Sequence, residues 1–199
     1  MKITAFMGST RKNRNTDTML KSLIKDMGKY DLQTYYLKDM KINHCIGCYY
    51  CGKKGECVFN DDLSQVYKRI DESDVIILAS PVYFNSVTSA TKTFIDRMQV
   101  YWSNKYLLGN RDYKDKFGIL LTDGGAEYDD TQFLGVDLVM DHFFKCLNCK
   151  DTYSYYVANT DDYPLYTDEK IIEELIEIGN GIENLKPGRV IKTRKEEND

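Results

Sequence analysis

Val75-Ile76-Ile77-Leu78-Ala79 decides the fold of this chain, because it is apolar at every position. A strand that is buried on both faces has this continuous pattern, whereas a half-buried strand alternates apolar and polar residues. The stretch therefore predicts a central strand of a parallel sheet. Ser80-Pro81 follows directly, and Pro81 fixes its own φ and biases Ser80 toward an extended conformation.

Short apolar runs alternate along the chain with stretches of helical spacing, which is typical of βαβ units. The sequence predicts an α/β fold with a flavodoxin-like, doubly wound, five-stranded parallel sheet in the order 2-1-3-4-5. A cysteine-rich insertion over 43–62 follows strand 2. In such a sheet, ligands bind at the carboxyl ends of strands 1 and 3. The predicted strands are 2–7, 32–37, 75–79, 117–122 and 152–157, and the predicted helices are 16–27, 63–72, 87–100, 131–144 and 169–179.

Length, charge and composition limit the class of protein. The 199 residues suit one α/β domain, which we predict over 1–191, with a charged, disordered tail over 192–199. The net charge is -4 and the basic residues are scattered, so nucleic acid is not an expected partner. We expect a cytoplasmic protein, because the first residues lack a signal-peptide pattern and no run of eighteen apolar residues suits a membrane.

The loop after the first predicted strand combines hydroxyls, amides and cations: Gly8-Ser9-Thr10-Arg11-Lys12-Asn13-Arg14-Asn15-Thr16. Backbone N–H groups at a helix N-terminus favour phosphate, and these side chains add donors and positive charge. The glycine spacing of dinucleotide or Walker-type sites is absent, so a terminal monophosphate fits better. Alternatively, Asn15 or Thr16 only caps the helix. The predicted ligand contacts are Ser9, Thr10, Arg11, Asn15 and Thr16.

Two aromatic residues and a proline follow the central strand in Ser80-Pro81-Val82-Tyr83-Phe84-Asn85-Ser86. A flat ring can stack here, although the aromatics can equally pack under the next helix. Paired glycines after strand 4 allow a ligand to approach the backbone closely, or they form a flexible turn. The predicted cofactor contacts are Pro81, Val82, Tyr83, Phe84, Asn85, Gly124 and Gly125.

Four cysteines lie within thirteen residues, as Cys45-Ile-Gly-Cys48-Tyr-Tyr-Cys51 followed by Cys57. In a reducing compartment, such a cluster indicates metal or redox chemistry. The compact triad suits an iron–sulfur cluster with Cys57 as the fourth ligand, while zinc and bare thiols stay open as alternatives. Cys146 and Cys149 are interpreted as small core residues, with a redox pair or extra metal ligands as the alternative.

Taken together, the motifs resemble the NADPH-dependent FMN reductase family, specifically its iron–sulfur flavoprotein branch. The resemblance covers roughly 1–156. It implies that the first loop holds the FMN phosphate, that Pro81 to Asn85 lies along the isoalloxazine, and that Cys45, Cys48, Cys51 and Cys57 bind a [4Fe-4S] cluster. It also implies a homodimer or homotetramer. The motifs are the loop 8–16, Cys45-x-x-Cys48-x-x-Cys51-x5-Cys57-x3-Asp61-Asp62, and Ser80-Pro81-Val82-Tyr83-Phe84 followed by Lys92-Thr93-Phe94-Ile95-Asp96-Arg97.

We therefore expect an FMN-dependent oxidoreductase that passes electrons from NAD(P)H through FMN to a quinone, a free flavin or an iron–sulfur cluster. The flavin would perform the chemistry, so no catalytic side chain is predicted. One alternative is an electron carrier for a ferredoxin-like partner, and another is a non-enzymatic, zinc-containing binding module. Asp61 and Asp62 are interpreted as a helix start, Lys92 and Arg97 as a solvated face or an ion pair, and the apolar stretch 100–108 as a subunit interface or a packed hairpin.

Overall fold

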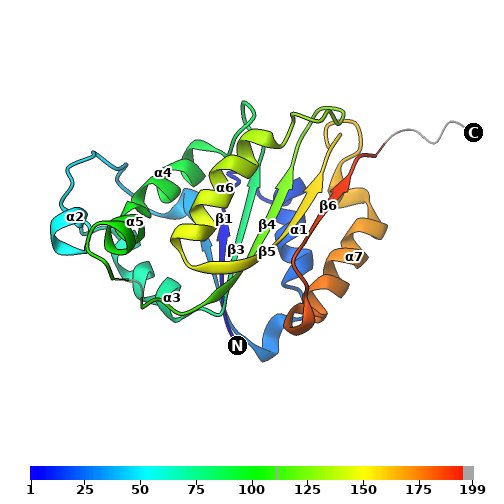
Figure 1. The fold of residues 1–199 in the computed structure, drawn as a ribbon. Coiled ribbons are helices and arrows are strands. Elements are labelled where there is room, and N and C mark those ends of the chain that lie inside the picture. Colours follow the sequence, from blue (N-terminus) through cyan, green and yellow to red (C-terminus); the bar gives the residue numbers. More distant parts are fainter. Residues whose placement is uncertain (111, 195–199) are drawn as a thin grey trace, which may run out of the picture.

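Six parallel strands form one sheet in the order β2-β1-β3-β4-β5-β6 (Figure 1). The computed structural model describes residues 1–110 and 112–194. The predicted order of the first five strands is confirmed, and β6 adds a sixth at the edge. Lys192 is the last residue of β6, and residues 195–199 of the predicted tail lie outside the described residues. The strands are β1 (Lys2–Met7), β2 (Asp31–Tyr36), β3 (Val75–Pro81), β4 (Lys116–Asp123), β5 (Cys149–Val157) and β6 (Gly188–Lys192).

Helices cover both faces of the sheet, as a doubly wound fold requires. One face is covered by α1 (Asn15–Leu23) and α7 (Glu169–Asn180), and the other by α3 (Val66–Glu72), α4 (Ser89–Arg97) and α6 (Leu134–Cys146) (Figure 1). The helix α5 (Gln99–Tyr106) follows α4 directly and packs against the short α2 (Cys51–Lys54) of the cysteine loop. Five 3-10 helices complete the described chain: η1 (Met27–Lys29), η2 (Leu37–Asp39), η3 (Asp62–Gln65), η4 (Leu165–Thr167) and η5 (Ile182–Asn184).

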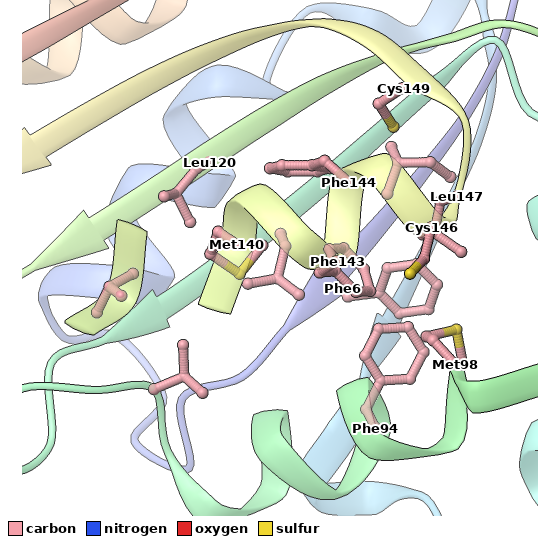
Figure 2. Close-up of a cluster of buried hydrophobic side chains, with 14 of the residues drawn as sticks. Phe6, Phe94, Met98, Leu120, Met140, Phe143, Phe144, Cys146, Leu147 and Cys149 are labelled. Carbon is pink, nitrogen blue, oxygen red and sulfur yellow. The ribbon is translucent and has the colours of Figure 1, made fainter. Parts of the chain in front are cut away.

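Successive strand residues enter two separate cores, because neighbouring side chains point to opposite faces of a sheet. On β1, Ile3, Ala5 and Met7 pack with α1 and α7, whereas Phe6 packs with the helices of the other face. The Phe6 and Phe94 ring centroids are 4.3 Å apart. Figure 2 shows this second core, with aromatic and sulfur-containing side chains gathered between the sheet and α6. All seven residues of β3 are buried, which confirms the predicted central strand.

The predicted helix over 87–100 is two helices, α4 and α5, with Met98 between them. The stretch 100–108 was interpreted as a subunit interface or a packed hairpin. Up to Tyr106 it is the helix α5 and not a hairpin, with Tyr101 in the core and Tyr106 and Leu107 half exposed. Every helix in the described ranges is too short or too polar to cross a membrane.

Candidate functional site

Three loops meet at the carboxyl edge of the sheet, where β1, β3 and β4 end. Pro81 and Asp123 are partners at the ends of β3 and β4. The N–H of Gly8 donates to the Ala79 carbonyl at 2.7 Å, and the Thr88 hydroxyl donates to the Gly8 carbonyl at 2.8 Å. These bonds bring the first and second predicted site loops together at the point where the strand order reverses.

The first loop forms a tight turn at the N-terminus of α1. Ser9 is buried and its hydroxyl accepts from the Arg11 backbone N–H at 3.2 Å, while Thr10 and Arg11 are exposed. Because the first N–H groups of a helix have no partner within the helix, they are available to an anion at this end of α1. The geometry thus suits the predicted phosphate contacts.

Asn15 and Thr16 use their side chains to hold other segments of the chain. The Asn15 amide donates to the Thr160 carbonyl at 3.4 Å and accepts from the Leu165 N–H at 2.9 Å. The Thr16 hydroxyl donates to the Asp123 carboxylate. The side chains of Asn15 and Thr16 therefore fix the loop, and their backbone N–H groups at this helix end are available to a ligand.

Asp123 is a site residue that sequence reasoning missed. Its side chain is buried, and this burial raises its pKa to about 6, although the hydrogen bond from Thr16 and the charge of Arg11 oppose the shift. The missed indication was its position directly at the end of β4, beside the predicted phosphate loop. A buried carboxyl whose pKa is raised to about 6 therefore lies just behind that loop.

The second loop is a two-residue turn held by reciprocal hydrogen bonds between Tyr83 and Ser86, at 2.8 and 3.0 Å. Phe84 and Asn85 have φ values of 48° and 56°. Positive φ is rare for a bulky residue and concentrates at functional sites. Phe84 is fully exposed, so the fold presents its ring to solvent instead of packing it.

The third loop, after β4, packs closely on neighbouring segments. A Cβ on Gly125 would lie 2.4 Å from an Asp161 carboxylate oxygen, and one on Gly124 would lie 2.6 Å from the Gln132 amide. Among the described residues, the buried Gln132 Oε1 and Asn159 Oδ1 have no hydrogen-bond donor. Because buried polar atoms are nearly always paired, these two acceptors suit a ligand with N–H or O–H groups.

The four clustered cysteines line one cavity of about 230 Å3. Cys45 and Cys48 are exposed, Cys51 and Cys57 are half-buried, and the Cys51 sulfur lies 3.3 Å from the Ser103 hydroxyl. Within the part of the chain that the structure describes, no three metal-ligating side chains come close enough to hold a single ion. The four thiols therefore surround a shared space rather than one point.

Arg97, Asp61 and Asn43 form a clasp at the base of the cysteine loop. The Arg97 guanidinium pairs with the Asp61 carboxylate at 2.7 Å and donates to the Asn43 carbonyl at 2.8 Å. The Asn43 N–H donates to Asp61 at 3.0 Å. Asp61 also caps η3, which confirms its interpretation as a helix start, and Arg97 proves to be in a buried ion pair rather than on a solvated face.

Cys146 and Cys149 lie away from this loop, at the end of α6 and the start of β5. Burial raises the pKa of both thiols, to about 12 for Cys149. Since the thiolate is the reactive form, both stay protonated at neutral pH and serve packing, as the sequence predicted.

A sequence profile of the NADPH-dependent FMN reductase family matches residues 1–133, which include all three loops and the cysteine loop. The chain belongs to this family.

Curated relatives and solved structures agree with this membership. An iron-sulfur flavoprotein of Archaeoglobus fulgidus is 41% identical over 111 residues, which are 55% of this chain and 50% of that protein. A second from the same organism is 36% identical over 130 residues, 64% of each chain. This chain thus spans about half to two thirds of these relatives. The NAD(P)H:quinone oxidoreductase of Methanothermobacter marburgensis shares the fold, with a TM-score of 0.73, 12% identity and coverage of 94% of this chain and 98% of that one.

The turn between Tyr83 and Ser86 depends on Gly135, which lies outside it in α6. A Cβ on Gly135 of α6 would lie 2.0 Å from the Asn85 carbonyl oxygen. We expect Gly135→Ala to displace the Tyr83–Ser86 turn and to lower the free energy of unfolding by about 1–3 kcal/mol, the usual cost of overpacking. Urea denaturation measures this cost. The control is Gly28→Ala, because Gly28 has open space around it and should tolerate the methyl group; equal stability of the two variants would refute the prediction.

Proposed function

We propose that this chain is an FMN-dependent oxidoreductase that passes electrons from NAD(P)H to a quinone, a free flavin or an iron–sulfur cluster. The observation that supports it most is the meeting of three site loops at the switch point of a chain whose residues 1–133 match the FMN reductase family. Bound FMN supplies the hydride and electron chemistry, and the polypeptide binds it, orients it and excludes water.

The N-terminal end of α1 is the proposed phosphate site. Ser9, Thr10 and Arg11 supply side-chain and backbone donors, and Asn15 and Thr16 supply N–H groups of the first helical turn. The helix dipole adds positive potential at this end. These donors fit the terminal phosphate of FMN without any catalytic side chain.

The second and third loops are the proposed site of the flavin ring and the ribityl chain. The exposed Phe84 ring and the turn from Pro81 to Asn85 offer a flat surface for stacking. Gly124 and Gly125 have no side chain to keep a ligand away from the backbone of the third loop. Within residues 1–110 and 112–194, the buried acceptors Gln132 Oε1 and Asn159 Oδ1 have no hydrogen-bond partner. They fit the hydroxyl and N–H donors of a flavin.

Arg11→Ala should raise the Kd of FMN by about tenfold or more, because a charge-assisted hydrogen bond to phosphate contributes about 1.5–3 kcal/mol. Flavin fluorescence titration measures the Kd. Riboflavin lacks the phosphate, so its affinity should be the same in both proteins. Arg14→Ala is the matched control, since the Arg14 guanidinium donates to the Tyr166 hydroxyl at 2.9 Å. Equal loss of FMN and riboflavin binding would argue against a phosphate site.

The cysteine loop is the proposed site of a [4Fe-4S] cluster, with Cys45, Cys48, Cys51 and Cys57 as ligands. Four cysteines around one cavity that Arg97 also lines fit the donor set and the negative charge of such a cluster. When bound, the cluster supplies one-electron transfer. This favours a second function, an electron carrier for a ferredoxin-like partner.

The two functions are separated by anaerobic purification followed by assays of flavin, iron, sulfide and turnover. An oxidoreductase reduces an artificial acceptor with NADH or NADPH, whereas an electron carrier accepts electrons from reduced ferredoxin and ignores both nicotinamides. Flavin-free protein would refute the proposed function. A colourless, zinc-loaded protein would point to the binding module instead.

We also propose a cytoplasmic homodimer or homotetramer. Six free thiols, two of them exposed, suit a reducing compartment. The apolar side chains Tyr49, Tyr106 and Leu107 are exposed on the cysteine loop and at the end of α5, where a second copy can cover them. Ultracentrifugation of the flavin-loaded protein gives its mass in solution.

A further inference from the structure

Arg97 is the most deeply buried basic residue among those that the structure describes, ahead of Lys116. Its side chain is 1% exposed at the end of α4, and its partner Asp61 is 6% exposed. Through Asp61 and the Asn43 carbonyl, it ties together the two ends of the cysteine loop. The Phe59 ring centroid lies 5.1 Å from the guanidinium carbon. The guanidinium is therefore held by hydrogen bonds from its N–H groups and by the ring against its planar face.

The Nε–H of Arg97 is left without an acceptor. It is buried, and none of the residues in the described ranges accepts from it. Buried donors are almost always paired, and an unpaired one often marks the place of a bound ion or redox group. Arg97 lines the same cavity as Cys45, Cys48, Cys51 and Cys57.

The positive charge of Arg97 also suits an iron–sulfur group in this cavity. A guanidinium stays positive at every physiological pH, whereas a four-thiolate iron–sulfur group is anionic and gains a further negative charge on reduction. Hydrogen bonds to its sulfur atoms and positive charge nearby both favour the reduced form, and so raise the reduction potential.

We infer that Arg97 positions the cysteine loop around an iron–sulfur group and raises the reduction potential of that group, with Nε–H as the donor to a sulfur atom. This inference rests on the cluster in the proposed function. It makes Arg97 a positioning residue and not a cluster ligand.

The test is Arg97→Lys in protein reconstituted without oxygen from ferrous iron and sulfide, followed by a potentiometric titration monitored by electron paramagnetic resonance. Lysine keeps the charge and can pair with Asp61, but it has no donor at the Nε position. At a fixed potential we expect the ratio of reduced to oxidised cluster to fall about tenfold, a shift of about 59 mV for one electron.

Two control variants separate the donor from general loosening of the loop. Arg69→Lys alters an arginine of α3 that pairs with Asp31 and should leave the potential unchanged. Asp61→Asn weakens the clasp but removes a negative charge, so it should raise the potential while Arg97→Lys lowers it. If both variants of the clasp lower the potential or lose iron alike, Arg97 acts through the ion pair alone and the inference is wrong.

The remaining outcomes are also decisive. Loss of iron from Arg97→Lys alone, with iron retained in both controls, supports positioning. An iron-loaded Arg97→Lys protein with the wild-type potential overturns the inference and leaves the proposed function intact. A wild-type protein that takes up no iron overturns both the inference and the cluster, whereas FMN binding and nicotinamide turnover test the oxidoreductase separately.

Discussion

Arg97→Met should lower the free energy of unfolding of the cofactor-free chain by about 3–5 kcal/mol, because it leaves the Asp61 carboxylate buried without its cation. The Asp61 side chain is 6% exposed and has Asn43 and Leu63 N–H groups as its other donors. Urea denaturation at pH 7 measures the loss. A cost below 1 kcal/mol would mean that water or a rearranged loop replaces the guanidinium.

The double variant Arg97→Met, Asp61→Asn should recover most of this loss. Asparagine has no charge to desolvate and keeps one acceptor oxygen, which can serve either the Asn43 or the Leu63 N–H because these two groups bond to different oxygens of Asp61. Burial acts to raise the pKa of Asp61, but hydrogen bonds from Arg97 and Asn43 outweigh it and hold the pKa below its ordinary value of 3.8. The stabilisation is therefore present above pH 4 and is lost as the pH falls through the native pKa, so wild type and Arg97→Met should converge in acid.

Asp123→Asn should stabilise the chain by roughly 3 kcal/mol at pH 7. This is the free energy that the native state spends on ionising a carboxyl whose pKa has been raised from 3.8 to about 6. Burial raises the pKa of Asp123 from 3.8 to about 6, with Thr16 and Arg11 opposing the shift and Asp161 adding to it. The native state therefore binds a proton more tightly than the unfolded state, and stability falls as the pH rises from about 4 to about 6. Asparagine stays neutral and still accepts from Thr16.

The measurement is urea denaturation of Asp123→Asn and wild type at several pH values between 4 and 7. The difference in stability should be small at pH 4 and grow toward pH 7. Asp130→Asn, at an exposed carboxylate, should show no such growth. If the two aspartate variants show the same pH dependence, Asp123 is not the titrating group. Under the proposed function, Asp123→Asn should also bind FMN more tightly, because one negative charge beside the phosphate is removed.

Local patterns in the sequence predicted most of the fold. Val75 to Ala79 predicted the central strand because a strand that is buried on both faces is apolar at every position. β6 was missed because Gly188–Lys192 is a short edge strand with a cation at each end of its apolar pair. The break at Met98 was missed because helical spacing continues through it, with Arg97 before it and Tyr101 after it both buried.

The site was predictable in its location but not in its internal bonding. The switch-point rule places the loops after Met7 and Ala79 at one edge, and the structure brings them together there. The partners of Asn15 and Thr16 are more than one hundred residues away, so no local pattern shows that these side chains hold Thr160 and Asp123. For the same reason, the pairing of Arg97 with Asp61 was visible only in the folded chain.

The bonds from Asn15 to Thr160 and Leu165 have a consequence for biosynthesis. The loop at the start of α1 leaves the ribosome well before Thr160 and Leu165, which lie about 145 residues later in the chain and supply two of its fixing contacts. A nascent chain therefore has strand β1 but no finished loop beside it. Completion of this corner of the molecule therefore waits for synthesis of residues 160–165, and a chain halted before Leu165 lacks it however well its earlier strands have paired.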